Sequence, residues 1–100
     1  MGLPGMKPLA LLLALHTVTF SWNQPKTPNL AYNSVYCSGR SGGPYTLLVR
    51  SKQPTHKISK TLNHTGNLFC VVTSSQRLTV GSNAVLVESL KSNQVEIVLH

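Results

Sequence analysis

The sequence predicts an all-β fold: a small antiparallel β-sandwich, or a small barrel, with one disulfide and a signal peptide before it. Short segments rich in apolar and β-branched residues recur at intervals of about 8–12 residues, and polar turns separate them. No segment sustains the period of 3.6 residues that an amphipathic helix requires. The chain has 100 residues and two cysteines, a number that suits a single stapled domain.

The first residues have the order of a secretory signal. A charged residue, Lys7, precedes the apolar run Leu9–Leu15, and small residues at Thr19 and Ser21 occupy the −3 and −1 positions of a cleavage site before Trp22. The run is shorter than the roughly 20 apolar residues that a membrane span needs. We therefore expect residues 1–21 to be a signal peptide, and the product to be secreted, extracellular and without a membrane span.

The remaining chain divides into an arm and a β domain. Residues 22–32 contain two prolines and little apolar content, which is typical of an extended N-terminal arm, and residues 33–100 form the domain. Lys60 falls on the apolar side of its segment and indicates an edge strand, where an inward lysine blocks unwanted pairing. The predicted strands are Asn33–Cys37, Tyr45–Arg50, His56–Leu62, Leu68–Val72, Arg77–Val80, Ala84–Glu88 and Val95–Leu99.

The two cysteines, Cys37 and Cys70, both fall inside predicted strands and among apolar neighbours. In an oxidising compartment such a pair forms a disulfide. Closing a loop of this length stabilises a fold by roughly 3–4 kcal/mol in the chain-entropy model. A bridge between two inward faces would join two sheets, or two distant strands of one barrel.

One run resembles a family motif. His64-x-Gly66-x-Leu68-x-Cys70 has the spacing of the Asp-x-Gly-x-Tyr-x-Cys run of immunoglobulin-like domains, and the resemblance extends from about Pro28 to His100. It implies an immunoglobulin-like sandwich with Cys37 on strand B and Cys70 on strand F. The chain departs from the family in having no tryptophan between the cysteines, leucine in place of the corner tyrosine and histidine in place of the acid.

The charge is strongly positive. Nine Lys and Arg residues stand against two acidic ones, a formal net charge of +7. A basic surface attracts sulfated glycans or an acidic protein, and the plain alternative is a solvated face that aids solubility. A secreted chain is a poor partner for nucleic acid. The candidate contact residues are Arg40, Arg50, Lys52, Lys57 and Lys60.

Catalytic and metal-binding patterns are missing from the sequence. The chain has no aspartate, and its two acids, Glu88 and Glu96, do not form the paired carboxylates that hydrolysis of a glycosidic bond uses. Neither a Ser-His-acid arrangement nor zinc-ligand spacing is present. We expect no enzyme activity, no catalytic residue, no metal and no cofactor.

Asn63-His64-Thr65 is an acceptor sequence for an N-linked glycan, and it falls in a predicted turn.

Together the signal peptide, the disulfide, the glycan acceptor and the immunoglobulin resemblance predict a secreted glycoprotein. We expect it to bind an extracellular or cell-surface protein, as a soluble ligand, a decoy or a receptor-type domain. The loops Arg40–Pro44 and Gln53–His56 would make the contacts at one end of the sandwich. The alternative is a small cationic factor that binds heparan-type glycans or other polyanions.

Overall fold

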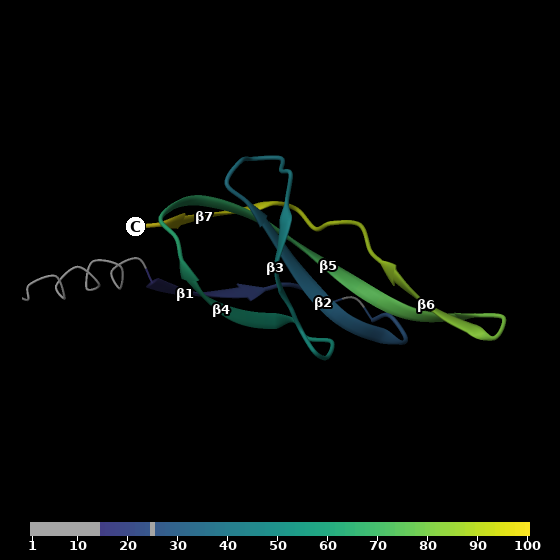
Figure 1. Cartoon of the computed structure of the whole chain (residues 1–100). Helices are drawn as coiled ribbons and strands as arrows, with labels where there is room; N and C mark the ends of the chain where they lie inside the picture. The colour runs from purple at the N-terminus through teal and green to yellow at the C-terminus, as the bar shows by residue number, and fades with distance from the viewer. Residues whose placement is uncertain (1–14, 25) are drawn as a thin grey trace, which may run out of the picture.

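The chain folds into antiparallel β-strands that form two sheets, as a computed structural model describes for residues 15–24 and 26–100 (Figure 1). No helix among these residues is long and apolar enough to cross a membrane. The strands are β1 (Leu15–Ser21), β2 (Leu30–Ser38), β3 (Thr46–Arg50), β4 (Lys57–Asn63), β5 (Gly66–Val80), β6 (Asn83–Glu88) and β7 (Val95–Leu99).

The smaller sheet has two strands, β1 and β4. Its apolar and polar residues alternate, so that Phe20 lies opposite Ile58 on one face. On the other face Thr19 lies opposite Ser59, and their hydroxyl oxygens are 2.9 Å apart. This alternation turns one face of the small sheet toward the core and the other toward solvent.

The larger sheet has five strands, in the order β3-β2-β5-β6, and β7 also pairs with β5. The central strand, β5, is 15 residues long. Along one of its edges it pairs with β2. Along the other edge, β6 pairs with its last residues and β7 with its first.

Two serines complete the β5 edge between β6 and β7. The backbone N–H groups of Ser89 and Ser92 donate to the carbonyls of Ser74 and Val72, at 2.8 and 2.9 Å. In return, the two serine hydroxyls accept the N–H groups of Ser74 and Val72, at 2.9 and 2.8 Å. The backbone N–H and C=O groups of β5 therefore have hydrogen-bond partners here, although no strand lies beside them. Backbone polar groups inside a folded chain need such partners.

The hydrophobic core draws on both sheets. Val35 is its most buried member, with 1% of its surface exposed. Each fully buried side chain of this kind contributes about 1.5–3 kcal/mol to stability, so the core holds the two sheets together. Its buried residues are Phe20, Val35, Cys37, Leu62, Leu68, Cys70 and Leu99.

The predicted all-β class, the antiparallel pairing and the disulfide are confirmed. Three assignments differ by more than two residues. The first 14 residues of the predicted signal lie outside the described part of the chain, but its last seven form β1. β2 begins at Leu30, inside the predicted arm. The two predicted strands Leu68–Val72 and Arg77–Val80 are one strand, because the polar residues between them pair with β2 instead of turning.

Candidate binding face

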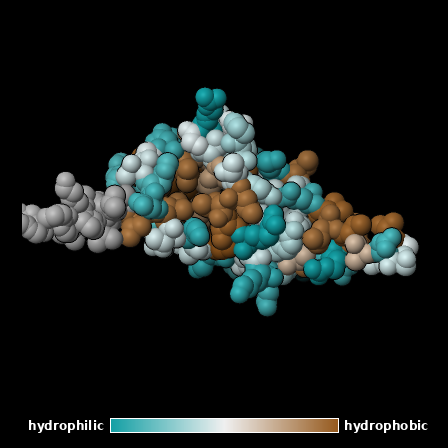
Figure 2. Space-filling model, viewed as in Figure 1, coloured by the Kyte–Doolittle hydropathy of each residue, from teal (hydrophilic) through white to brown (hydrophobic). Residues whose placement is uncertain are grey.

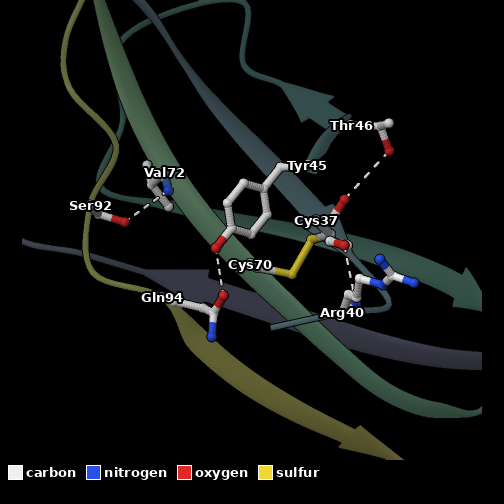
Figure 3. The surroundings of a disulfide bond; sticks show 9 residues. Cys37, Arg40, Tyr45, Thr46, Cys70, Val72, Ser92 and Gln94 are labelled. Carbon is white, nitrogen blue, oxygen red and sulfur yellow. Dashed lines mark hydrogen bonds between the residues drawn. A yellow bond between two sulfur atoms is a disulfide. The ribbon is translucent and has the colours of Figure 1, made fainter. Parts of the chain in front are cut away.

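The disulfide joins neighbouring strands of one sheet. Cys37 on β2 and Cys70 on β5 are register partners, and both side chains are buried in the core (Figure 3). The expectation that the bridge connects two sheets or two distant strands is therefore wrong. The cysteines do point inward, but from adjacent strands and toward the same side. The immunoglobulin resemblance implied a bridge between sheets, and in this respect the structure differs from that family.

The loop between β2 and β3 carries Arg40. Gln94, which directly precedes β7, holds this loop in position (Figure 3). The Gln94 Oε1 atom accepts hydrogen bonds from the Gly42 N–H, at 2.7 Å, and from the Tyr45 hydroxyl. Its Nε2 donates to the Ser41 hydroxyl at 3.0 Å. Gly42 has a φ of 85°, which favours glycine at this turn. No local pattern marks Gln94, because its partners are far away in sequence.

The other predicted contact loop, Gln53–His56, follows β3 and is anchored at its start to β2 through the Ser51 N–H, which donates to the Asn33 carbonyl at 2.9 Å. The loop that contains Arg40 precedes β3. The two loops thus lie at opposite ends of one short strand, as Figure 1 shows. The expectation that they gather at one end of the molecule is wrong.

The five basic candidates are all exposed, but the structure distributes them over both sheets. Arg50 ends β3, in the larger sheet, whereas Lys57 and Lys60 lie on β4, in the smaller one. Arg40 and Lys52 lie in the loops before and after β3. Because β3 pairs with β2 and β4 pairs with β1, Arg50 does not lie on a strand next to the one that carries Lys57 and Lys60.

Another group of side chains gathers on the larger sheet, on the side away from the core. We call this group the outer face. Residues on it alternate along β2 with Val35 and Cys37, which point into the core. Two small residues form its floor, since Ser34 has 0% and Thr73 3% of its surface exposed. The outer face consists of Tyr32, Ser34, Tyr36, Arg50, Thr73 and Glu88.

Arg50 is held in place by two neighbours on β2. Its guanidinium carbon lies 4.6 Å from the centre of the Tyr32 ring, a cation–π distance. Its Nε donates a hydrogen bond to the Ser34 hydroxyl at 3.0 Å. Because a guanidinium carries five N–H donors in a planar fork, the other nitrogens remain to bind a carboxylate or a carbonyl of a partner.

Glu88 forms the acidic part of the outer face. Its Oε2 accepts hydrogen bonds from the Thr73 hydroxyl at 2.6 Å and the Tyr36 hydroxyl at 2.5 Å. The hydrogen bond from Thr73 and then that from Tyr36 lower the pKa of Glu88 from its ordinary value of 4.5. Burial opposes this shift, and the positive charges of Arg50 and Lys91 add to it. The carboxylate is therefore ionised at neutral pH.

The arrangement suits recognition. It combines two tyrosines, an arginine and a carboxylate on a sheet surface, and the residues 15–24 and 26–100 hold no group of three His, Cys, Asp or Glu side chains that could bind a metal ion. Part of this face can be read from the sequence, because Tyr32, Ser34 and Tyr36 stand at alternate positions and so share one side of a strand. Glu88 joins them only through the pairing of β5 with β6.

The predicted glycan acceptor, Asn63, is the last residue of β4 and is exposed, as are His64 and Thr65 after it. The exposure that glycosylation requires is thus present in the folded chain.

The fold and the outer face define the class of this protein as an all-β chain with antiparallel sheets, one intra-sheet disulfide and a polar, tyrosine-containing sheet surface. No family model matches the sequence, and neither a curated protein nor a solved structure does.

Proposed function

We propose that this protein is a secreted, extracellular binding protein that recognises another extracellular or cell-surface protein through its outer face. The observation that carries the proposal is the gathering of Tyr32, Tyr36 and Arg50 on one sheet surface. Tyrosine and arginine are among the residue types that dominate the binding energy of protein interfaces. An acidic or carbonyl-rich partner surface would complement Arg50.

The contacts within the outer face favour tight binding, because they order the side chains before a partner arrives. Arg50 is fixed by the Tyr32 ring and the Ser34 hydroxyl, and Tyr36 by Glu88. A side chain that loses rotamer freedom at an interface costs about 0.5–1.5 kcal/mol, and this cost falls when the side chain is already ordered.

The extracellular location rests on three features. The apolar run Leu9–Leu15 has the order of a secretory signal, the disulfide suits an oxidising compartment, and Asn63 offers an exposed glycan acceptor. An immunoglobulin-like sandwich, with its disulfide inside one sheet instead of between sheets, is the finer fold we propose, since one core serves both sheets. The binding proposal depends on the outer face and not on that family.

The test is a binding screen of the secreted protein against an array of extracellular domains, followed by variants of the outer face. We expect the double change Tyr32→Ala and Arg50→Ala to weaken binding to any protein identified by at least about 30-fold, the effect of losing an interface hot spot. The matched control is Lys57→Ala, which removes the same charge from the smaller sheet. Equal affinity of the double variant and the wild type would refute the outer face as the binding site.

A second candidate function is a cationic factor that binds sulfated glycans or other polyanions. The net charge of +7 and the exposure of Arg40, Arg50, Lys52, Lys57 and Lys60 favour it. The placement of these residues on both sheets predicts a diffuse contact and not a single defined site.

A further inference from the structure

The hairpin of β5 and β6 extends away from the rest of the molecule, and β6 is the last strand in the order of the larger sheet (Figure 1). No strand within residues 15–24 and 26–100 pairs with its outer edge. All residues of β6 are exposed, including the apolar Val85 (40%), Leu86 (51%) and Val87 (46%). Figure 2 shows apolar surface gathered along this hairpin.

The register of the hairpin identifies which backbone groups of β6 are unpaired. A two-residue turn, Gly81-Ser82, makes Val80 and Asn83 partners, and the pairing continues without a bulge to Ser75 and Glu88. Successive residues of an antiparallel strand turn their N–H and C=O groups to opposite edges. Because the closing pair of such a turn is hydrogen-bonded, the groups of Asn83, Val85 and Val87 face β5.

The same alternation therefore turns the N–H and C=O groups of Ala84, Leu86 and Glu88 toward the free edge. Natural edge strands are usually protected by a lysine, a proline or a bulge. β4 has such a lysine, Lys60, but β6 has none of these features. An exposed and regular edge of this kind, whose one charged residue, Glu88, lies at the end of the strand, is a template for another strand.

We propose that the occupant of this edge is β6 of a second copy of the chain, paired antiparallel about a two-fold axis with Leu86 opposite Leu86 of the partner subunit. Each of the outward groups then meets its counterpart, and roughly six backbone hydrogen bonds form at two per bonded pair. The two five-stranded sheets would become one continuous sheet across the dimer.

The sequence of β6 favours pairing with β6 of a second copy of the chain. A two-fold axis perpendicular to the sheet keeps each side chain on its own face, so Val85 lies opposite Val87 of the partner subunit and apolar residues meet on both faces. The only ionisable residue of β6, Glu88, lies opposite Ala84 of the partner subunit, so like charges are not opposed. Its carboxylate also points toward Thr73 and Tyr36.

The test is sedimentation equilibrium of the disulfide-bonded protein and of two substitutions at Ala84. In the single chain Ala84 faces Thr79, so neither substitution alters a charged contact there. In the dimer, Ala84→Lys faces Glu88 of the partner subunit and should tighten association, by roughly 2- to 30-fold because the contact occurs twice. Ala84→Glu should weaken association by a similar factor.

The sign of these effects separates strand pairing from general charge repulsion. The chain is basic, so an added lysine would weaken non-specific association and an added glutamate would strengthen it. Leu90→Lys is the control, since Leu90 lies outside β6 with 93% of its surface exposed, and it should not tighten the dimer. Tightening by Ala84→Glu, or by both lysine variants equally, would overturn the proposal.

A second variant removes the pairing without changing charge. Leu86→Pro deletes an N–H that points to the free edge, so the bonds between β5 and β6 remain, and proline is tolerated on edge strands. We expect this variant to be monomeric with an unchanged circular dichroism spectrum. A wild-type protein that stays monomeric up to about 1 mM, or a Leu86→Pro variant that still dimerises, would refute the proposal. The outer-face double variant should dimerise normally, which keeps this test independent of the proposed function.

Discussion

Asn33 is a polar residue in the interior, with 1% of its surface exposed. Its Oδ1 accepts hydrogen bonds from the Thr55 N–H and the Gln24 amide, both at 2.9 Å. Its Nδ2 donates to the Ser74 hydroxyl at 2.9 Å and back to Gln24 at 3.0 Å. One amide thus ties the N-terminal arm, β2, β5 and the loop after β3 together, because a buried polar group must find partners.

We predict that Asn33→Ala destabilises the fold by about 3 kcal/mol, since it removes the hydrogen bonds of a buried amide to Gln24, Ser74 and Thr55 and leaves the Thr55 N–H without its acceptor. Urea unfolding followed by circular dichroism measures the change. Asn93→Ala, at an exposed position, is the matched control and should lie within about 0.5 kcal/mol of the wild type. Similar unfolding midpoints for both variants would contradict the structural role of Asn33.

Glu88 predicts a dependence of stability on pH. Its pKa is lowered in the folded chain, first by the hydrogen bond from Thr73 and then by that from Tyr36. A carboxyl group with a lowered folded pKa stabilises the fold above its unfolded pKa, and this contribution is lost as the pH falls through the folded pKa. Glu88→Gln should therefore be less stable than the wild type at pH 7, by a small amount because Glu88 is exposed.

The measurement is thermal unfolding of the wild type and Glu88→Gln between pH 7 and pH 2. The difference in stability should shrink below about pH 4.5, the ordinary pKa of the group. Tyr36→Phe should reduce the pH dependence of the wild type, because it removes one of the two hydroxyl donors to Glu88. A constant difference across this pH range would contradict the assignment.

Among the individual elements, strand β1 bears on where the predicted signal peptide is cleaved. It occupies residues that the sequence assigns to the end of the signal peptide, yet it pairs along its whole length with β4 and contributes Phe20 to the core. Cleavage before Trp22 would remove this strand and leave the apolar side of β4 without its neighbour.

We predict that a chain starting at Trp22 is less stable by at least about 4 kcal/mol than one starting at Leu15, since the loss of a buried Phe side chain alone costs 3–5 kcal/mol. Denaturant unfolding of the two chains, with the disulfide intact in both, is the measurement. Equal stability would show that β1 contributes little to the fold. N-terminal sequencing of protein secreted from mammalian cells would then show which of the two chains is made.

At the scale of the whole molecule, charge sets the behaviour toward polyanions. We predict that the protein is retained on heparin at low salt and released as the Debye length falls from about 10 Å at 0.1 M to 3 Å at 1 M. Changing Arg50, Lys52 and Lys57 to serine should lower the salt concentration needed for elution.

The control for this prediction is a second triple variant that removes the same charge elsewhere, at the exposed residues Lys26, Arg77 and Lys91. If polyanion binding uses the predicted residues, the first triple variant elutes earlier than the control. Equal elution of both would mean that net charge alone determines retention, and the second candidate function would then lose its proposed site.

Some features were predictable because they depend on neighbours in the sequence. Alternation of apolar and polar residues marks most strands, as in Val95–Leu99, and turn residues such as Gly81-Ser82-Asn83 mark their ends. The run Thr73–Gln76 is the exception. Its polar composition predicts a break, but Thr73 and Ser75 are buried against β2, so strand pairing outweighs composition there.

The all-β class, the antiparallel strands and the disulfide follow from the sequence alone, because period-2 patterning and two cysteines in a short chain are local or compositional properties. Which strands are neighbours is a decision made only in the folded molecule. That decision places Cys37 beside Cys70 in one sheet, separates Arg50 from Lys57 and brings Glu88 to Tyr36. The physical reason is that strand order depends on long-range pairing and core packing, to which residues distant in the sequence contribute together.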